Sequence, residues 1–199
     1  MDIFNLIEKK SHNIAKKIGN GDTEEDIELY EYSIFMILSN IFTIGIGLLF
    51  SIILGYFRYF IFSEISFILI RLVAGGSHCD TFKKCFFVSN IISIISCLIA
   101  ILTINYSYVM IFISFISCIL ILPICPKPST NSPSRGYYED IKFRKKFAYR
   151  CIFLILISIV AFGLDLFFIT SSICSGILVV CFVVSDIGEK FINNLSKLF

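Results

Sequence analysis

The chain has 199 residues, of which 57% are hydrophobic and only 16% are charged, and its mean hydropathy is +0.87. This composition excludes an ordinary soluble globular domain and indicates an integral membrane protein. The net charge of +2 says little as a sum, because the charges are segregated along the chain.

Most of the eight cysteines lie inside apolar runs, where Cys behaves as a small hydrophobic residue, so we expect no disulfide scaffold. The first 33 residues are polar and charged, which is not the pattern of a cleavable signal peptide.

Residues 1–33 are predicted to form N-terminal cytoplasmic amphipathic helices. Apolar residues recur at near-helical spacing over residues 2–18, with four lysines between them. This pattern is compatible with a helix on an anionic membrane face and equally with a helix packed on the protein. Gly19-Asn20-Gly21 ends this helix, and Asp22 or Thr23 is expected to cap a second one. His12 is expected to be exposed.

Six apolar segments follow within residues 34–186, and residues 187–199 are expected to form a short cytoplasmic tail. Several segments are shorter than the roughly 20 residues that a perpendicular span requires, and the second either spans or is re-entrant. The predicted fold is therefore all-α: a polytopic membrane protein with about six transmembrane or re-entrant helices. The segments are about Ile34–Phe57, Tyr59–Val73, Cys85–Ile104, Ser107–Cys125, Tyr149–Ile169 and Ser172–Asp186.

Basic residues gather in every second connection. They lie before the first segment, between the second and third, and between the fourth and fifth, whereas the alternate connections at Arg58, Asn105 and Thr170-Ser171 hold one basic residue between them. Positive charge marks the cytoplasmic side. Both termini and the connection between the second and third segments are therefore predicted to be cytoplasmic.

That connection carries the most reactive side chains of the chain. His78 and Cys85 are seven residues apart, and Gly75-Gly76 just before them is expected to break the helix and to offer backbone N–H groups to a bound carbonyl. A new helix capped by Asp80 or Thr81 would place Cys85 near its first turn. Lys83, Lys84 and the helix dipole would then favour a thiolate.

Other interpretations of these residues exist. Cys79 is a second candidate nucleophile, although neighbouring side chains rarely point at each other. His78, Cys79, Asp80 and Cys85 are also zinc-ligand types, but their spacing matches no regular zinc motif, and we expect no metal and no cofactor. A third interpretation is a polar loop without a chemical role.

Charged residues also lie inside the apolar segments, among them Glu64, Arg71 and Asp165. Glu64 and Arg71 are two turns apart on one helix face, so we expect them to form a structural ion pair. Asp165 is a possible orienting partner for His78, although the sequence gives no distance between them.

Arg71, Gly75, Gly76, His78 and Cys85 together form a pattern that resembles the AgrB family, the accessory gene regulator membrane peptidases of Gram-positive bacteria. A basic, proline-containing loop after the fourth apolar segment strengthens the resemblance. The resemblance implies that His78 and Cys85 are a catalytic dyad. It also implies a location in the bacterial cell membrane and a homodimer, and we expect no nucleic acid partner.

The resemblance further implies a substrate of the AgrD type, a propeptide with an amphipathic leader and an acidic tail. Removal of the tail would leave the peptide on Cys85, and an internal nucleophile would close a thiolactone or lactone ring. The basic loop is expected to contact the anionic inner leaflet and to bind the acidic tail through Lys142, Arg144, Lys145 and Lys146. The competing interpretation is a non-enzymatic peptide exporter or its binding subunit.

The charge asymmetry leads to a prediction about topology. In a variant without native cysteines, a thiol reagent that cannot cross membranes should label a cysteine introduced at Asn105 in intact cells. It should miss cysteines introduced at Ser77 or Ser132, because these positions lie in cytoplasmic connections. Labelling at Ser132 without labelling at Asn105 would invert the orientation.

Overall fold

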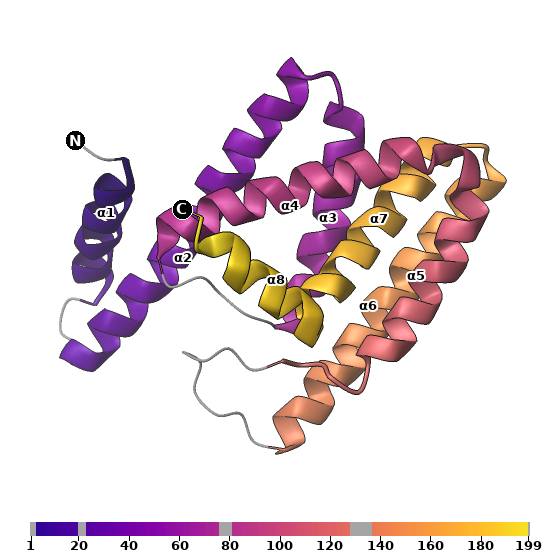
Figure 1. Ribbon diagram of the computed structural model, residues 1–199. Coiled ribbons are helices and arrows are strands. Elements are labelled where there is room, and N and C mark those ends of the chain that lie inside the picture. Colours follow the sequence, from indigo (N-terminus) through magenta and orange to yellow (C-terminus); the bar gives the residue numbers. More distant parts are fainter. Residues whose placement is uncertain (1–2, 20–22, 76–80, 128–136, 199) are drawn as a thin grey trace.

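The computed structural model describes residues 3–19, 23–75, 81–127 and 137–198, and these residues form helices without a β-strand (Figure 1). The all-α prediction is therefore confirmed for the described part of the chain. The helices are α1 (Ile3–Ile18), α2 (Glu24–Ile53), α3 (Phe57–Ala74), α4 (Phe82–Leu102), the short 3-10 helix η1 (Ile104–Tyr106), α5 (Ser107–Ile121), α6 (Tyr137–Gly163), α7 (Phe167–Val184) and α8 (Asp186–Ser196).

Five described helical stretches are long and apolar enough to cross a membrane. They are Ser33–Ile53, Lys83–Leu102, Ile104–Ile121, Asp140–Gly163 and Phe167–Val184. The second predicted segment forms α3, one uninterrupted helix of 18 residues that contains Arg58, Glu64 and Arg71. A helix of that length rises about 27 Å, close to the thickness of the hydrocarbon core.

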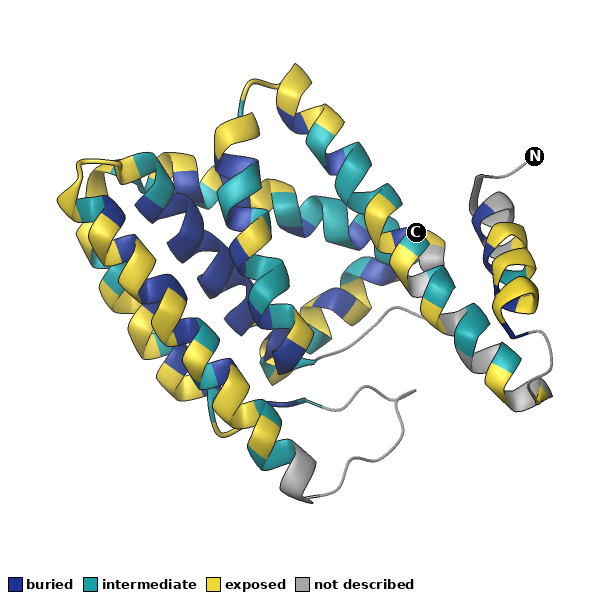
Figure 2. Ribbon diagram, turned by 180° about the vertical axis from the view of Figure 1, so that it is seen from behind, coloured by how far each residue is buried: buried dark blue, intermediate teal, exposed yellow. Residues whose placement is uncertain are grey.

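α7 lies at the centre of the bundle, and 72% of its residues are buried (Figure 2). It packs against α3, α4, α5 and α6. Small residues make this close packing possible: Ser171, Ser172, Cys174, Ser175 and Gly176, near the middle of α7, are all buried. Small side chains let helix backbones approach closely in an apolar environment.

Hydroxyl groups attach each of the four neighbouring helices to α7. Ser66 of α3 donates to the carbonyl of Ile173 at 3.2 Å, and Ser114 of α5 donates to the carbonyl of Cys174 at 3.2 Å. For the other two neighbours, α4 and α6, the hydroxyl donors belong to α7. Ser171 donates to the carbonyl of Ala100 at 2.6 Å, and Thr170 donates to the carbonyl of Ser158 at 3.2 Å.

The sequence placed a turn at Thr170-Ser171, and this prediction is wrong. The turn between α6 and α7 lies at Leu164–Leu166, where Asp165 has a φ of +58°. Thr170 and Ser171 are buried hydrogen-bond donors inside α7 rather than loop residues. α6 also begins twelve residues before the predicted Tyr149, because the charged residues after Tyr137 continue the same helix.

The N-terminal helices pack on each other. α1 buries Ile7, Ser11 and Ala15, and it packs against α2. His12 of α1 is partly exposed, with 44% of its side chain accessible, and its Nδ1 lies 2.7 Å from Glu31 Oε2, a partner that the sequence did not predict. α2 begins after Thr23, whose hydroxyl accepts from the backbone N–H of Asp26, and it continues without a break into the first apolar segment.

Most of the residues expected to form the C-terminal tail are helical and make up α8. Ser185 separates α7 from α8, and its hydroxyl accepts from the backbone N–H of Gly188 at 3.1 Å. A Cβ on Gly188 would lie 1.9 Å from the carbonyl oxygen of Phe182. A glycine is therefore needed where α8 folds back on the end of α7.

The close contact between α3 and α7 predicts that Gly176→Ala destabilises the bundle. An added Cβ would lie 2.0 Å from Ser66 Oγ and 2.3 Å from the carbonyl oxygen of Ser63. Overpacking of this kind costs about 1–3 kcal/mol, so the thermal midpoint of the purified protein in detergent should fall. Gly45→Ala is the matched control, because a Cβ there would meet no described atom within 4 Å. Equal midpoints for the two variants would contradict the packing.

Candidate functional site

Cys85 lies in the first turn of α4. The Thr81 hydroxyl caps this helix by accepting from the backbone N–H of Lys84 at 3.4 Å, and the N–H of Cys85 donates to the Thr81 carbonyl at 3.0 Å. Thr81, one of the two predicted caps, is thus confirmed as the cap. The Cys85 side chain is half-buried, with its Sγ 3.9 Å from Ser89 Oγ. The first turn of a helix favours negative charge, which suits a thiolate at this position.

The predicted helix break at Gly75 is confirmed. α3 ends there with φ +70° and ψ −145°, a conformation that only glycine adopts readily. The guanidinium of Arg71 donates to the Gly75 carbonyl at 2.5 Å. A Cβ on Gly75 would lie 2.4 Å from the carbonyl oxygen of Lys127. The segment that contains Lys127 can therefore approach the end of α3 this closely only because residue 75 is a glycine.

Gly75 and Thr81 are thus two fixed points on either side of the candidate site. Gly76, His78, Cys79 and Asp80 lie between them, outside the described residues. The roles of Gly76 in an oxyanion hole and of His78 as the base stay predictions.

The predicted ion pair between Glu64 and Arg71 is not formed among the described residues. Glu64 Oε2 instead accepts from Ser93 Oγ of α4 at 2.8 Å. Arg71 instead donates to the carbonyl of Gly75, at the end of its own helix. Sequence spacing aligned these two residues on one helix face, but a neighbouring helix offers Glu64 a closer partner than Arg71.

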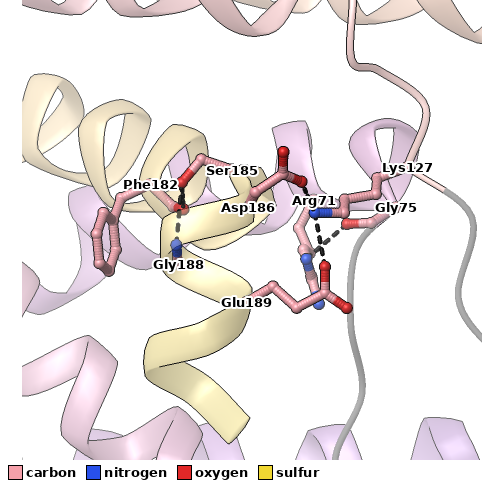
Figure 3. A network of polar contacts seen from close by, with 8 residues as sticks. All are labelled: Arg71, Gly75, Lys127, Phe182, Ser185, Asp186, Gly188 and Glu189. Carbon is pink, nitrogen blue, oxygen red and sulfur yellow. Dashed lines mark hydrogen bonds and ion pairs between the residues drawn. The ribbon is translucent and has the colours of Figure 1, made fainter.

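Lys127 joins three parts of the chain beside Gly75 (Figure 3). Its backbone N–H donates to the Ala74 carbonyl at 2.8 Å. Its ammonium lies 2.7 Å from both Asp186 Oδ1 and Glu189 Oε2 of α8, and only 14% of its side chain is exposed. The sequence marked Lys127 only as one positive charge of a loop, and no spacing rule pairs it with residues about sixty positions later.

These contacts shift the pKa values of both partners. Burial lowers the pKa of Lys127, but the hydrogen bonds that its ammonium donates to Asp186 and Glu189 outweigh burial, so the net shift of the pKa is upward. The hydrogen bond from Lys127 holds the pKa of Asp186 below its ordinary value. The contribution of Asp186 to stability is therefore present above the ordinary carboxyl pKa and is lost as the pH falls through the lowered value.

A second thiol lies at this end of the bundle, on the segment that follows α5. Cys125 is fully buried, and burial raises its pKa to about 12. Cys125 therefore stays protonated at neutral pH and is a poor nucleophile compared with a partly exposed thiol at a helix N-terminus.

The four basic residues of the expected tail-binding group lie on α6 and differ in their surroundings. Arg144 donates to the backbone carbonyls of Cys125 at 3.0 Å and Pro123 at 3.2 Å, so it holds the segment after α5 in place. The Lys146 ammonium lies 5.5 Å from the centre of the Phe143 ring. Lys142 and Lys145 are exposed and point to no described partner.

Asp165 lies at the opposite end of the bundle from Cys85. The turn that contains it is beside the end of α4, where Thr103 Oγ1 lies 3.4 Å from Ser171 Oγ. Thr103 follows Cys85 by eighteen positions along the helix, a rise of about 27 Å. Asp165 is therefore too far from Cys85 to orient a base beside it, which answers a question that the sequence left open.

Two further polar contacts were missed by sequence reasoning. Ser93 is the partner of Glu64, and Arg150 of α6 donates to the carbonyl of Leu69 on α3. Arg150 lies inside an apolar run, which was the one available signal that it faces another helix. Among the described residues, no group of three or more His, Cys, Asp or Glu side chains could hold a metal ion.

Comparison with known proteins bears on the whole chain. No curated protein and no solved structure matches it. The family model for Accessory gene regulator B matches residues 8–184, a range that contains every candidate residue of the site. The chain therefore belongs to the accessory gene regulator B family, which takes part in processing the accessory gene regulator pheromone.

Proposed function

We propose that the protein is a membrane-embedded cysteine endopeptidase that removes the C-terminal tail of an AgrD-like propeptide and promotes ring closure. The observation that carries the proposal is the position of Cys85 in the first turn of α4, directly after a link anchored at Gly75 and Thr81. His78 is three residues from each anchor. Three residues of chain reach about 11 Å at most, so this spacing in the sequence is short enough for the proposed pairing of His78 with Cys85.

In the proposed reaction, His78 takes the proton of the Cys85 thiol, and the thiolate attacks the peptide carbonyl at the tail junction. Backbone N–H groups near Gly75 and Gly76 stabilise the oxyanion. His78 then gives its proton to the leaving amine, which departs with the tail. The pheromone segment remains as a thioester on Cys85.

Ring closure is the second step. An internal Cys or Ser of the bound peptide loses a proton and attacks the thioester carbonyl, and the Cys85 sulfur leaves and regains a proton. The ring is a thiolactone or a lactone. Exchange of one thioester for another changes the bond energy little, so holding the internal nucleophile close to the thioester is the main requirement.

The positions of the basic residues support the proposed orientation. The ends of α3 and α5 and the starts of α6 and α8 converge through Lys127 and Arg144, while the turns at Thr103 and Asp165 lie at the other end. The end that holds Cys85 is thus the basic end. We place it, with both termini, at the cytoplasmic face and the anionic inner leaflet, and we propose a homodimer.

The dyad is tested by replacing each member. Cys85→Ala and His78→Ala should each abolish cleavage of a co-expressed propeptide, because the nucleophile or its base is lost, while membrane insertion is unchanged. Cys79→Ala should retain most activity and is the matched control. The products are followed by mass spectrometry. Cleavage by the Cys85→Ala protein would exclude this mechanism, and no cleavage by the unaltered protein would favour the exporter.

Tail binding is tested at Lys142 and Lys145, because these two side chains are exposed, whereas Arg144 has a structural partner. Replacing both by Glu should raise the KM for the propeptide and flatten its dependence on salt, with kcat nearly unchanged. Each exposed pair contributes only about 0.2–1 kcal/mol, so a rise in KM of roughly tenfold or less is expected. A fall in kcat at constant KM would instead mean that α6 affects the geometry of the site.

A further inference from the structure

α8 exposes an apolar stripe next to the face that it buries. The helix runs back from the end of α7 toward the first half of α4 (Figure 1), and Ile192 in its middle is buried in a cluster that joins α4 and α7. Ile187 and Phe191 of α8 are 73% and 40% exposed, and Leu198, just after its end, is 76% exposed. Residues four and eleven positions apart lie on the same side of a helix. These three side chains therefore form one exposed apolar line, the α8 stripe.

The charges of α8 are arranged around this stripe. Asp186 and Glu189 both pair with Lys127 at 2.7 Å. Lys190 and Lys197 are exposed and form no ion pair with the described residues. By helical spacing these two lysines flank the stripe on the side away from the buried face. A buried face, an apolar stripe and lysines beside the stripe are typical of a helix that lies in the plane of a membrane surface.

The α8 stripe continues into a cavity between α4, α7 and α8. The cavity has a volume of about 310 Å³, and the side chains that line it are all apolar. Phe191 belongs both to the stripe and to the cavity wall, and the centre of its ring lies 5.7 Å from that of Phe182 at the end of α7. The remaining wall residues belong to two stretches that can cross a membrane, Lys83–Leu102 and Phe167–Val184. The cavity is therefore at the depth of the lipid hydrocarbon.

We infer that α8 lies in the plane of the membrane, at the end of the bundle where α4 begins, and that the α8 stripe and the cavity bind an acyl chain of an anionic phospholipid. The acyl chain fills the cavity and covers the stripe, and Lys190 and Lys197 hold the phosphate of the headgroup. Long lysine side chains can reach from an apolar surface to the charged boundary of the membrane. The pairing of Asp186 and Glu189 with Lys127 offsets part of the negative charge that would repel such a lipid.

Charge favours a lipid over a second copy of the chain at this surface. In a two-fold dimer each surface meets its own copy, so the lysines beside the two stripes would be brought together. A phospholipid instead brings a negative phosphate to these lysines and an apolar chain to the stripe. A polar ligand fits the cavity poorly, because its hydrogen bonds would be lost among the apolar side chains.

The test uses fluorescence, because the chain contains no Trp and one introduced Trp is then the only source of indole emission. Phe191→Trp places this reporter in the stripe, and Asn193→Trp places it at an exposed polar position of the same helix as the matched control. The full-length protein is reconstituted in phosphatidylcholine vesicles. Brominated acyl chains quench a Trp in the hydrocarbon, whereas iodide quenches a Trp in water. Phe191→Trp should be quenched strongly by the brominated chains and weakly by iodide, and Asn193→Trp should show the reverse.

A second measurement tests the class of lipid. Quenching of Phe191→Trp by brominated phosphatidylglycerol is compared with quenching by brominated phosphatidylcholine in mixed vesicles, which gives the preference of the site for the anionic lipid. Lys190→Gln and Lys197→Gln should each lower this preference by about fivefold, the effect of one lysine near an anionic surface. Lys9→Gln with Lys10→Gln is the charge-matched control for the pair, because these exposed lysines belong to α1, which packs on α2.

The cavity is tested with Leu178→Phe, combined with Phe191→Trp. Leu178 lines the cavity, so the larger ring takes up space that the acyl chain would use. Quenching by the brominated chains should therefore fall for both lipids. Leu98→Phe is the matched control and should leave the quenching unchanged, because Leu98 is an exposed residue of α4 that does not line the cavity.

Strong quenching of Phe191→Trp by iodide with weak quenching by brominated lipid would overturn the inference, because the stripe would then face water. Quenching by brominated lipid that falls as the density of protein in the vesicles rises would also overturn it, because a second copy of the chain would then cover the stripe. Equal affinities for the two lipids, or quenching that Leu178→Phe leaves unchanged, would contradict the anionic lipid and its place in the cavity. None of these readouts depends on cleavage of a propeptide, so they test the lipid site independently of the proposed peptidase.

Discussion

The close packing of α7 is the constraint on which the rest of the structure depends. Gly176 admits the backbone of α3, and hydroxyl groups of Ser66, Ser114, Thr170 and Ser171 join α7 to its four neighbours. Apolar burial discriminates weakly between arrangements when lipid is as apolar as the core, so short distances and directional hydrogen bonds fix the register. The direction of α3 and α4 follows from this packing, and with it the ends that hold Gly75 and Cys85.

The candidate site is built from helix ends rather than from the helix faces that form the core. Gly75 closes α3 and Thr81 opens α4, and the end of α3 is held by Lys127, which comes much later in the chain. The helix dipole stabilises a thiolate in the first turn of a helix, whichever residues surround it. The proposed base, His78, belongs in sequence to the connection between these two helix ends.

The charged residues near the membrane each serve a local purpose. Arg71 and Arg144 satisfy backbone carbonyls at the ends of segments, Glu64 takes a hydroxyl donor from the next helix, and Lys127 is shared between two carboxylates. Burying such groups without partners would be expensive, which accounts for the use of backbone and hydroxyl groups where no opposite charge is near. Lys142 and Lys145 remain exposed and available to an acidic ligand.

The sequence by itself determined the helical membrane class, the break at Gly75 and the position of Cys85 in the first turn of a capped helix, because hydropathy, glycine conformations and capping are local properties. Only the tertiary structure decided which polar residues contact each other. Thr170 and Ser171 looked like a turn and are buried donors, Glu64 and Arg71 looked like a pair and are separate, and Asp165 lies at the far end of the bundle. Lys127 meets α8 only because α5 and α7 end side by side. Whether residues about sixty positions apart contact each other depends on how the helices pack, and no periodicity in the sequence predicts such a contact.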